Sequence, residues 1–216
     1  MGLNIVVGVL YVVESDSTEL VRADLVAVNE LLEQAGVPQW TEPDPAAFDE
    51  GESTEFEAWG YSGLHTLRRL AVHLAADGRL PEPLDAGQRA IDDPLLNTAS
   101  TALPSDPPGP FDHLLHHSDY EGYYVPVDFA HVIADKRAPG GYLGSSVRLL
   151  AETRRLAEAL GLPEGLDPHG EEVFDAADAK NQAEGWQRYG VEAYVCLQLL
   201  NAAKLSLSTG AAIAFT

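Results

Sequence analysis

Residues 191–205, VEAYVCLQLLNAAKL, predict the central element of the fold. Wound as a helix, this stretch is apolar on most sides, whereas a helix at the surface keeps one polar face. We therefore expect a long helix from Trp186 to Leu207 that lies buried in the core. It contains Cys196, the only cysteine of the chain, which excludes an intrachain disulfide. Its apolar surroundings predict a buried structural thiol rather than a nucleophile.

Other periodic segments surround this helix. Three of them carry apolar residues at helical spacing, near residues 20–35, 62–77 and 143–160. Apolar runs without that spacing predict strands. We expect strands near residues 3–13, 111–117, 126–133 and 211–215. The prediction is an α/β or α+β fold, in which a small central sheet is packed by about four helices.

The domain organisation follows from length and proline content. A chain of 216 residues suits one large domain, and we expect a single domain over residues 1–216. Residues 79–110 hold seven of the fourteen prolines, which argues against long regular elements there. So long a connection is unusual in a compact domain. It is interpreted as a lid, as a wrap over the surface or as a divider between two lobes.

The charge is strongly negative. The chain carries 34 acidic and 13 basic residues, a net charge of −21. Phosphate backbones and anionic membranes repel such a surface, so we expect no binding of nucleic acid and no membrane association. A basic protein partner is compatible with this charge, and so is a genome-wide adaptation, for example to high salt. The apolar N-terminus has no basic residues ahead of it and no small-residue cleavage site, so we expect a cytoplasmic protein.

The segment FDHLLHHSDYEGYYVPVDFAH, residues 111–131, is the main candidate for a site. If its first part is a helix, His113, His116 and His117 lie on one side. Such a set could hold a divalent metal ion, with Asp119 or Glu121 completing the ligands. Water on that metal would be acidic enough to attack a substrate near neutral pH, which predicts a hydrolytic site.

The same segment can instead form a strand, which the Leu-Leu pair and the turn residues SDYEG favour. His113 and His117 would then lie about 13 Å apart, at roughly 3.3 Å per residue, too far to share a metal ion. A site would form at the strand end, where ligands bind in open sheets. His117 would be the general base, oriented by Asp119 or Glu121. The ligand-binding residues around it would be His113, His116, Asp128 and His131.

A glycine-rich loop, residues 139–146, directly precedes a predicted helix. Backbone N–H groups at a helix start attract anions, and glycines let a ligand approach closely. The residues expected to bind a small polar or anionic ligand are Gly141, Gly144, Ser145 and Ser146. The spacing matches neither the Walker motif nor the dinucleotide fingerprint, and a tight turn with a serine cap is the structural alternative. One predicted strand joins this loop to His117, so both could form a single pocket.

An acidic loop, residues 42–57, offers a different site. Seven acids and several aromatic residues lie in and beside it, and no Lys or Arg occurs from 23 to 67. The carboxylates could steer a basic protein, and the aromatic residues could anchor it. Toxin-neutralising immunity proteins and nucleic-acid mimics resemble this segment in composition, a likeness that carries no residues across. The charges that such a partner would contact include Asp49, Glu50 and Glu52.

Two functions and a structural alternative follow from these patterns. The first function is a small-molecule or metal-binding pocket built from residues 113–131 and 139–146, with hydrolysis as one option. The second is an acidic protein-binding module, such as an immunity or inhibitor protein, that uses residues 42–57. The structural alternative is a domain without a pocket, whose histidines and acids only satisfy turns and the core.

Overall fold

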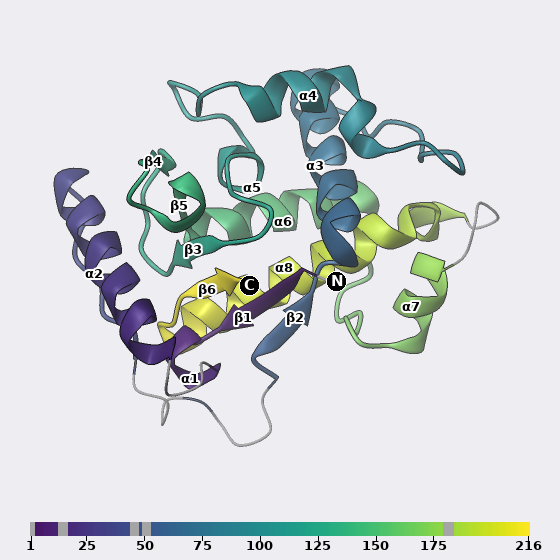
Figure 1. Ribbon diagram of the computed structural model, residues 1–216. Helices are drawn as coiled ribbons and strands as arrows, with labels where there is room; N and C mark the ends of the chain where they lie inside the picture. Colours follow the sequence, from purple (N-terminus) through teal and green to yellow (C-terminus); the bar gives the residue numbers. More distant parts are fainter. Residues whose placement is uncertain (1–2, 13–16, 44–47, 49–52, 179–183) are drawn as a thin grey trace.

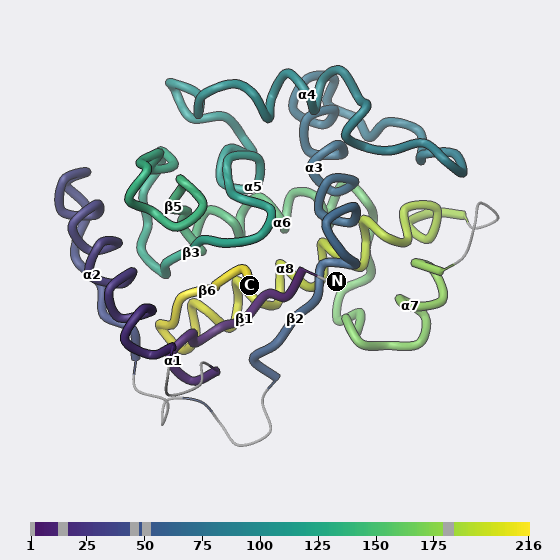
Figure 2. Tube along the Cα trace, viewed as in Figure 1, coloured from purple at the N-terminus to yellow at the C-terminus, as the bar shows by residue number. Residues whose placement is uncertain are grey.

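The computed structural model describes residues 3–12, 17–43, 48, 53–178 and 184–216. In this part of the chain, a six-stranded mixed sheet is packed by helices on both faces (Figures 1 and 2). The predicted α+β class with a small sheet is therefore confirmed.

The elements of the described chain are as follows. The strands are β1 (Asn4–Val7), β2 (Glu55–Glu57), β3 (Gly122–Val125), β4 (Ile133–Ala134), β5 (Tyr142–Ser145) and β6 (Ile213–Phe215). The α-helices are α1 (Val9–Val12), α2 (Thr18–Gln34), α3 (Gly60–Asp77), α4 (Pro94–Thr101), α5 (Asp112–Leu115), α6 (Ser146–Leu160), α7 (Glu171–Asp178) and α8 (Gly190–Thr209). The short 3-10 turns are η3 (Ala90–Asp92), η4 (Pro139–Gly141) and η5 (Gly185–Tyr189). Short helices in the connections account for the excess over the four that we expected.

The strand order is β2-β1-β6-β3-β5-β4, with β3 and β5 parallel and the other neighbours antiparallel. The last strand, β6, lies inside the sheet beside β1 (Figure 1). Asn4 and Thr216 exchange two backbone hydrogen bonds of 3.2 and 3.0 Å there. Alternation along β1 sends Ile5 to one face of the sheet and Val6 to the other, so two separate cores form.

Helix α8 is the centre of the larger core. Its side chains are buried along most of its length, and α3, α6 and α7 pack around it. The prediction of a buried core helix is confirmed, with its start moved to Gly190 because residues 185–189 form η5. The thiol of Cys196 is buried and donates to the carbonyl oxygen of Thr153 at 3.4 Å. Burial raises the pKa of this thiol to about 12, as expected for a structural cysteine.

Helix α2 covers the opposite face of the sheet. Its inward side chains belong to the second core, together with Tyr123 and Ala214 of the sheet. These helix residues are Val21, Leu25, Val28, Leu31 and Leu32. The helix ends as its sequence predicts, because Gly36 adopts a φ of +70° and Pro38 follows.

The N-terminal strand is shorter than the predicted 3–13. It ends at Val7 because Gly8 has a φ of +83°, in the left-handed region that favours glycine, and α1 begins directly afterwards. A side chain at Gly8 would also overlap the ring of Phe48. The strand predicted at 211–215 is confirmed in its last three residues, which form β6.

The strand predicted at 111–117 is wrong, because Asp112–Leu115 form helix α5. The cause is a carboxylate from a distant helix. Glu152 of α6 accepts the backbone N–H groups of His113 at 3.0 Å and of Leu114 at 2.7 Å. Backbone groups that are bound in this way cannot enter a strand ladder.

The strand predicted at 126–133 is misplaced. Pairing ends at Val125, the last residue of β3, because Pro126 has no N–H group to donate. It resumes only in β4, at Ile133.

The proline-rich segment 79–110 is partly regular, since it contains η3 and α4. Ala90 and Leu96 of this segment pack against Val72 of α3 in a small core. Figure 1 shows α4 lying across the end of α3. The segment is therefore tied to α3, while its role as a lid or lobe divider and the single-domain organisation stay predictions.

Candidate functional site

The buried polar network around α5 contains the histidines of residues 113–117. The Nδ1 atom of His113 accepts the N–H of Ser145 at 3.0 Å, so Nε2 carries the proton and donates to the carbonyl oxygen of Ala130 at 3.2 Å. Burial lowers the pKa of His113 to about 4, and the ring is neutral at pH 7. Both ring nitrogens of His113 are thus occupied within the protein.

His117 is the second residue after α5 and is also buried. Its ring stacks on Tyr124 at 4.1 Å and meets Phe215 edge-on at 4.6 Å between centroids. Nδ1 donates to the carbonyl oxygen of Ser118 at 3.0 Å, whereas Nε2 is buried with no partner among the described residues. Burial lowers the pKa of His117 to about 3, so the ring is neutral and packed like an aromatic core residue.

Asp119 is held by two residues of α3. It accepts hydrogen bonds from Arg68 and from His65, the latter at 2.7 Å. Burial raises the pKa of Asp119, but these two partners outweigh it and bring the pKa to about 2. Arg68 also donates to the carbonyl oxygens of Leu114 at 2.8 Å and of His117 at 2.7 Å, and it therefore joins α3 to the C-terminal end of α5.

A pocket of about 380 Å³ adjoins this network. Three residues predicted for the site line it, namely His116, His117 and Asp119. His116 is buried, which lowers its pKa, and its Nε2 lies 4.0 Å from the carboxylate of Asp112. The structure therefore brings these three residues together, and their catalytic and ligand-binding roles stay predictions.

Three other predicted residues lie apart from this pocket, at the surface. Asp128 pairs with Arg148 at 2.7 Å, and both side chains are about half exposed. His131 lies 3.5 Å from Asp106. Glu121 is exposed. The predicted convergence of Asp128 and His131 on His117 is not found.

The glycine segment 139–146 is not an open anion loop, because it contains strand β5. Gly144 is required in that strand since the ring of Tyr124 fills the space of a Cβ. Ser145 caps α6 by accepting the N–H of Arg148 at 3.4 Å, and its hydroxyl donates to the carbonyl oxygen of Val127 at 2.6 Å. Ser145 is therefore a helix cap, which was the structural alternative to an anion-binding residue.

The other two residues of that segment are also placed within the fold. The hydroxyl of Ser146 is buried and accepts from Ser206 at 2.8 Å. Gly141 adopts a φ of +80° at the end of η4, and its N–H donates to the carbonyl oxygen of Ala138 at 2.8 Å. The polar atoms expected to hold an anion therefore form hydrogen bonds within the protein instead.

Metal binding is not supported by the described part of the chain. No group of three or more His, Cys, Asp or Glu side chains in it could hold a metal ion. The expected divalent-metal site is therefore corrected: the imidazoles of His113 and His117 are taken up by backbone atoms and ring packing.

Sequence reasoning missed the two residues that organise this network, Arg68 and Glu152. Both occupy apolar faces of amphipathic helices, Arg68 beside Leu64 and Leu67, and Glu152 beside Leu149. A charge on a buried helix face must find a partner, because an unpaired buried charge costs several kcal/mol. A charged residue on the apolar face of a predicted helix was therefore the sequence signal for this network, although it does not identify the residue that pairs with the charge.

The described surface also carries a second polar region, which we call the acidic face. It consists of Glu55 and Glu57 on β2 and Glu171, Glu172, Asp175 and Asp178 on α7. All six side chains are exposed, and none forms an ion pair with a described residue. No Lys or Arg occurs between residues 156 and 179. The negative charge of this face is therefore not neutralised locally.

Aromatic side chains join the two parts of the acidic face. The ring of Trp59, which follows β2, lies 6.3 Å from Phe174 of α7, and both pack against Tyr194 of α8 at 5.1 and 5.3 Å. Phe174 is 39% exposed. Of the acidic loop predicted at 42–57, residues 55–57 form β2, while Asp49, Glu50 and Glu52 lie outside the described residues.

Taken together, the fold and its surface define an acidic α+β protein with an exposed array of carboxylates and no metal cluster in its described part. The family model described as "Putative DNA-mimic protein" matches residues 1–215, and the chain belongs to this family. No curated protein and no solved structure matches the chain.

This membership corrects the functional predictions. The family description points to an acidic protein that imitates nucleic acid, not to a hydrolytic, small-molecule or metal-binding pocket. The predicted immunity or inhibitor module is likewise unsupported. In place of the predicted partners, a small polar or anionic ligand or a basic protein, the family description points to proteins that bind DNA. We expect no binding of nucleic acid, whereas the family description makes nucleic acid the molecule that is imitated.

No helix in the described residues combines the length and the apolar character that crossing a bilayer requires.

Proposed function

We propose that this protein binds a DNA-binding protein at its DNA-contacting surface and thereby competes with DNA. The observation that carries the proposal is membership of the DNA-mimic family over residues 1–215, together with a net charge of −21. DNA-contacting surfaces are basic because they neutralise phosphates with Lys and Arg. An acidic protein that presents carboxylates to such a surface satisfies the same cations.

The acidic face is the surface that we assign to this role. Glu171, Asp175 and Asp178 lie at positions i, i+4 and i+7 of α7, on one side of the helix. With a rise of about 1.5 Å per residue, their spacing along the helix axis is about 6 and 4.5 Å. One DNA strand presents a charge about every 3.4 Å of axis. A row of carboxylates with spacing of this order can therefore face a row of cations that binds a phosphate backbone.

The inward side of α7 explains why its acids face solvent. Val173 and Ala176 are buried against α8 and fix the rotation of the helix. Phe174 stays partly exposed among the acids and offers an apolar contact of the kind that anchors interfaces. The carboxylates supply attraction at a distance, and the aromatic ring supplies contact area at the centre.

The most basic helix, α6, supports the same assignment. It carries Arg148, Arg154 and Arg155, and Arg148 is paired with Asp128. Three of the thirteen basic residues therefore lie on α6, whereas α7 and β2 carry none. We further propose that the protein acts in the cytoplasm, where a DNA-binding target meets DNA in a cell without a nucleus.

The test is a direct competition. The tagged protein is used at low salt to capture binding proteins, and one captured DNA-binding protein is purified with its duplex DNA. Fluorescence anisotropy then follows labelled DNA while this protein is added. We expect complete and stoichiometric displacement, and polyglutamate at equal charge should displace far less. A stable complex that leaves the DNA bound would overturn the proposal, because the target would then be engaged elsewhere.

A further inference from the structure

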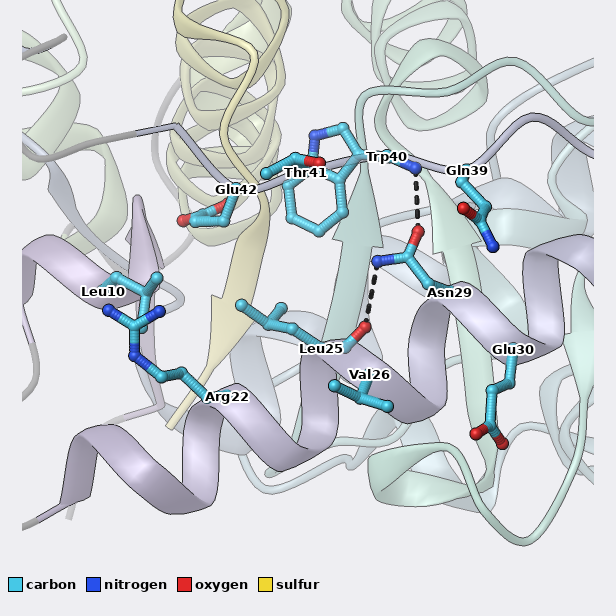
Figure 3. Close-up of a pocket in the computed structure, with 10 residues that line it drawn as sticks. All are labelled: Leu10, Arg22, Leu25, Val26, Asn29, Glu30, Gln39, Trp40, Thr41 and Glu42. Carbon is cyan, nitrogen blue, oxygen red and sulfur yellow. Dashed lines mark hydrogen bonds between the residues drawn. The ribbon is translucent and has the colours of Figure 1, made fainter.

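A second pocket, of about 590 Å³, lies on the other side of the sheet from α8 and outside the acidic face. It is bounded by α2 on one side and by residues 39–42 on the other (Figure 3). Leu25 and Val26 of α2 and Leu10 of α1 give it apolar walls. A single water occupies about 30 Å³ in the liquid, so this pocket has room for a side chain from a partner.

Trp40 forms a fixed wall of this pocket. Its backbone N–H donates to Asn29 Oδ1 at 2.8 Å, and its indole Nε1–H donates to the carbonyl oxygen of Gly210, also at 2.8 Å. Asn29 is itself fixed by a bond of 3.1 Å to the carbonyl oxygen of Leu25 (Figure 3). The indole is thus positioned before any ligand arrives, which lowers the entropy that binding would cost.

Glu42 places a buried acceptor in the same pocket. Its side chain is 9% exposed, and Oε2 accepts the N–H of Ala212 at 2.8 Å. Oε1 is buried and forms no hydrogen bond of regular geometry with a described residue, although the backbone N–H groups of Val9 and Leu10 approach the carboxylate. A buried carboxylate oxygen without a donor is costly, so a donor from outside would be favoured there.

We infer that this pocket receives an arginine side chain of the DNA-binding partner, with the guanidinium donating to Glu42 and lying beside Trp40. A planar guanidinium donates in a fork to a carboxylate and stacks on aromatic rings, which a lysine does less well. Such arginines are abundant on surfaces that bind DNA. The inference rests on the proposed function, since it names one contact of the same partner, which must extend from the acidic face on the α8 side of the sheet to α2 on the other side.

Arg22 is the residue that opposes this contact. It lines the pocket on the side of Leu10 (Figure 3), is exposed, and forms no ion pair with a described residue. An incoming guanidinium would have to displace it toward solvent. Removal of this charge should therefore strengthen binding, whereas removal of the Glu42 charge should weaken it. The two substitutions change the binding affinity in opposite directions only if a cation enters the pocket.

The pH dependence of binding gives a further readout. Burial raises the pKa of Glu42 to about 7, despite nearby backbone N–H groups of Ala212, Val9 and Leu10. The other charged or titratable groups near it in the described chain are Arg22 and Glu30 in the pocket and Tyr123 of β3. A bound guanidinium favours the ionised carboxylate, so binding should strengthen from pH 6 to pH 8.

The direct probe is Nα-acetyl-arginine amide, with the uncharged citrulline analogue as its matched control. The indole N–H signal of Trp40, assigned by Trp40→Phe, is followed by ¹H–¹⁵N NMR at pH 8. We expect a saturable shift with the arginine probe only, lost in Glu42→Gln and stronger in Arg22→Gln. Val26→Lys, at an exposed position, should block the pocket with its own cation. A shift that persists in Glu42→Gln, or that citrulline reproduces, would overturn the inference.

The partner-level experiment separates this inference from the proposed function. Glu42→Gln should weaken the complex with the captured DNA-binding protein at least tenfold, while duplex DNA still competes with whatever binding remains. Unchanged affinity in Glu42→Gln, with DNA still competing, rejects the pocket and keeps the proposed function. Loss of competition by DNA in the wild-type protein rejects the proposed function and, with it, the identity of the occupant. Thermal unfolding of each variant confirms that it folds.

Discussion

The buried network around α5 and the acidic face on β2 and α7 use similar residues under opposite conditions. In the network, Glu152 and Asp119 each accept hydrogen bonds from named partners inside the protein. On the acidic face, the carboxylates are exposed and form no ion pair with any described residue. Buried polar residues that form hydrogen bonds inside the protein stabilise the fold. Exposed charges that form no ion pair within the protein can instead attract a partner. The more conspicuous sequence motif is therefore not the better functional candidate.

The largest effect should come from the network. Glu152→Ala leaves the N–H groups of His113 and Leu114 without their acceptor and opens a cavity. We expect the free energy of unfolding at pH 7 to fall by about 3 kcal/mol, measured by urea denaturation. Glu158→Ala on the same helix, at an exposed position, is the matched control and should change stability by less than about 0.5 kcal/mol. Equal effects of the two changes would remove the distinction between buried and exposed acids.

Charge reversal on the acidic face should act on binding instead. Glu171→Lys with Asp175→Lys changes the net charge from −21 to −17, because each reversal adds two charges. We expect the captured DNA-binding protein to bind about 100-fold more weakly, roughly 2.7 kcal/mol, with unchanged stability. The control is Glu121→Lys with Glu158→Lys, which alters the net charge equally at exposed sites outside this face. If the control weakens binding as much, total charge and not this face determines recognition.

The two regions should also differ in how stability depends on pH. Burial raises the pKa of Glu152 to about 8 and that of Glu42 to about 7, from 4.5. The folded state therefore holds extra protons, and the stability that these groups contribute is lost as pH rises from about 4.5 to the folded pKa of each group, by up to about 1.4 kcal/mol per unit and group.

Buried His113 and His117 act in the opposite sense, because their lowered pKa values withdraw stability as pH falls below 6.5. Stability measured by urea denaturation should therefore peak between about pH 5 and pH 6, where the losses from the two kinds of group balance. Glu152→Gln should flatten the alkaline limb, and Glu171→Gln on the acidic face should leave it intact. If the loss of stability at alkaline pH persists in Glu152→Gln, another titratable group causes it.

The smallest effect is expected where an acid is neither buried nor on the acidic face. Asp128 pairs with Arg148 at 2.7 Å, but both are well exposed. Asp128→Asn should lower the free energy of unfolding by less than about 0.5 kcal/mol and leave partner binding unchanged. A marked loss of binding would extend the functional surface toward α6 and would revise the comparison between the two regions.

Much of the fold was predictable from local pattern. The inward residues of α2 recur at helical spacing, and Gly36 and Pro38 end that helix as expected. The candidate site was more difficult to predict. His113 and His117 form a conspicuous motif in the sequence, but the residues that surround them come from other elements. Ser145, Arg68 and Glu152 supply or accept the bonds that hold this region, and their distance in sequence hides the relation.

The acidic face illustrates the same point. The sequence shows that 34 acids are present, but not which of them are exposed without a partner. Glu42 and Glu57 both belong to the predicted acidic loop, yet the first is buried against the backbone of Ala212 and the second faces solvent. Strand pairing decides this, because the alternation along β2 buries Phe56 and turns its neighbours outward.

Composition and short-range periodicity were enough to predict the buried helix α8, the amphipathic helix α2, the structural nature of Cys196 and the negative charge. The folded chain was needed to show that residues 112–115 form a helix, that β6 lies inside the sheet and that Arg68 and Glu152 are buried with partners. The physical reason is that a buried charge or backbone N–H group must be satisfied, and its partner is found by the folded chain over distances that local sequence does not encode.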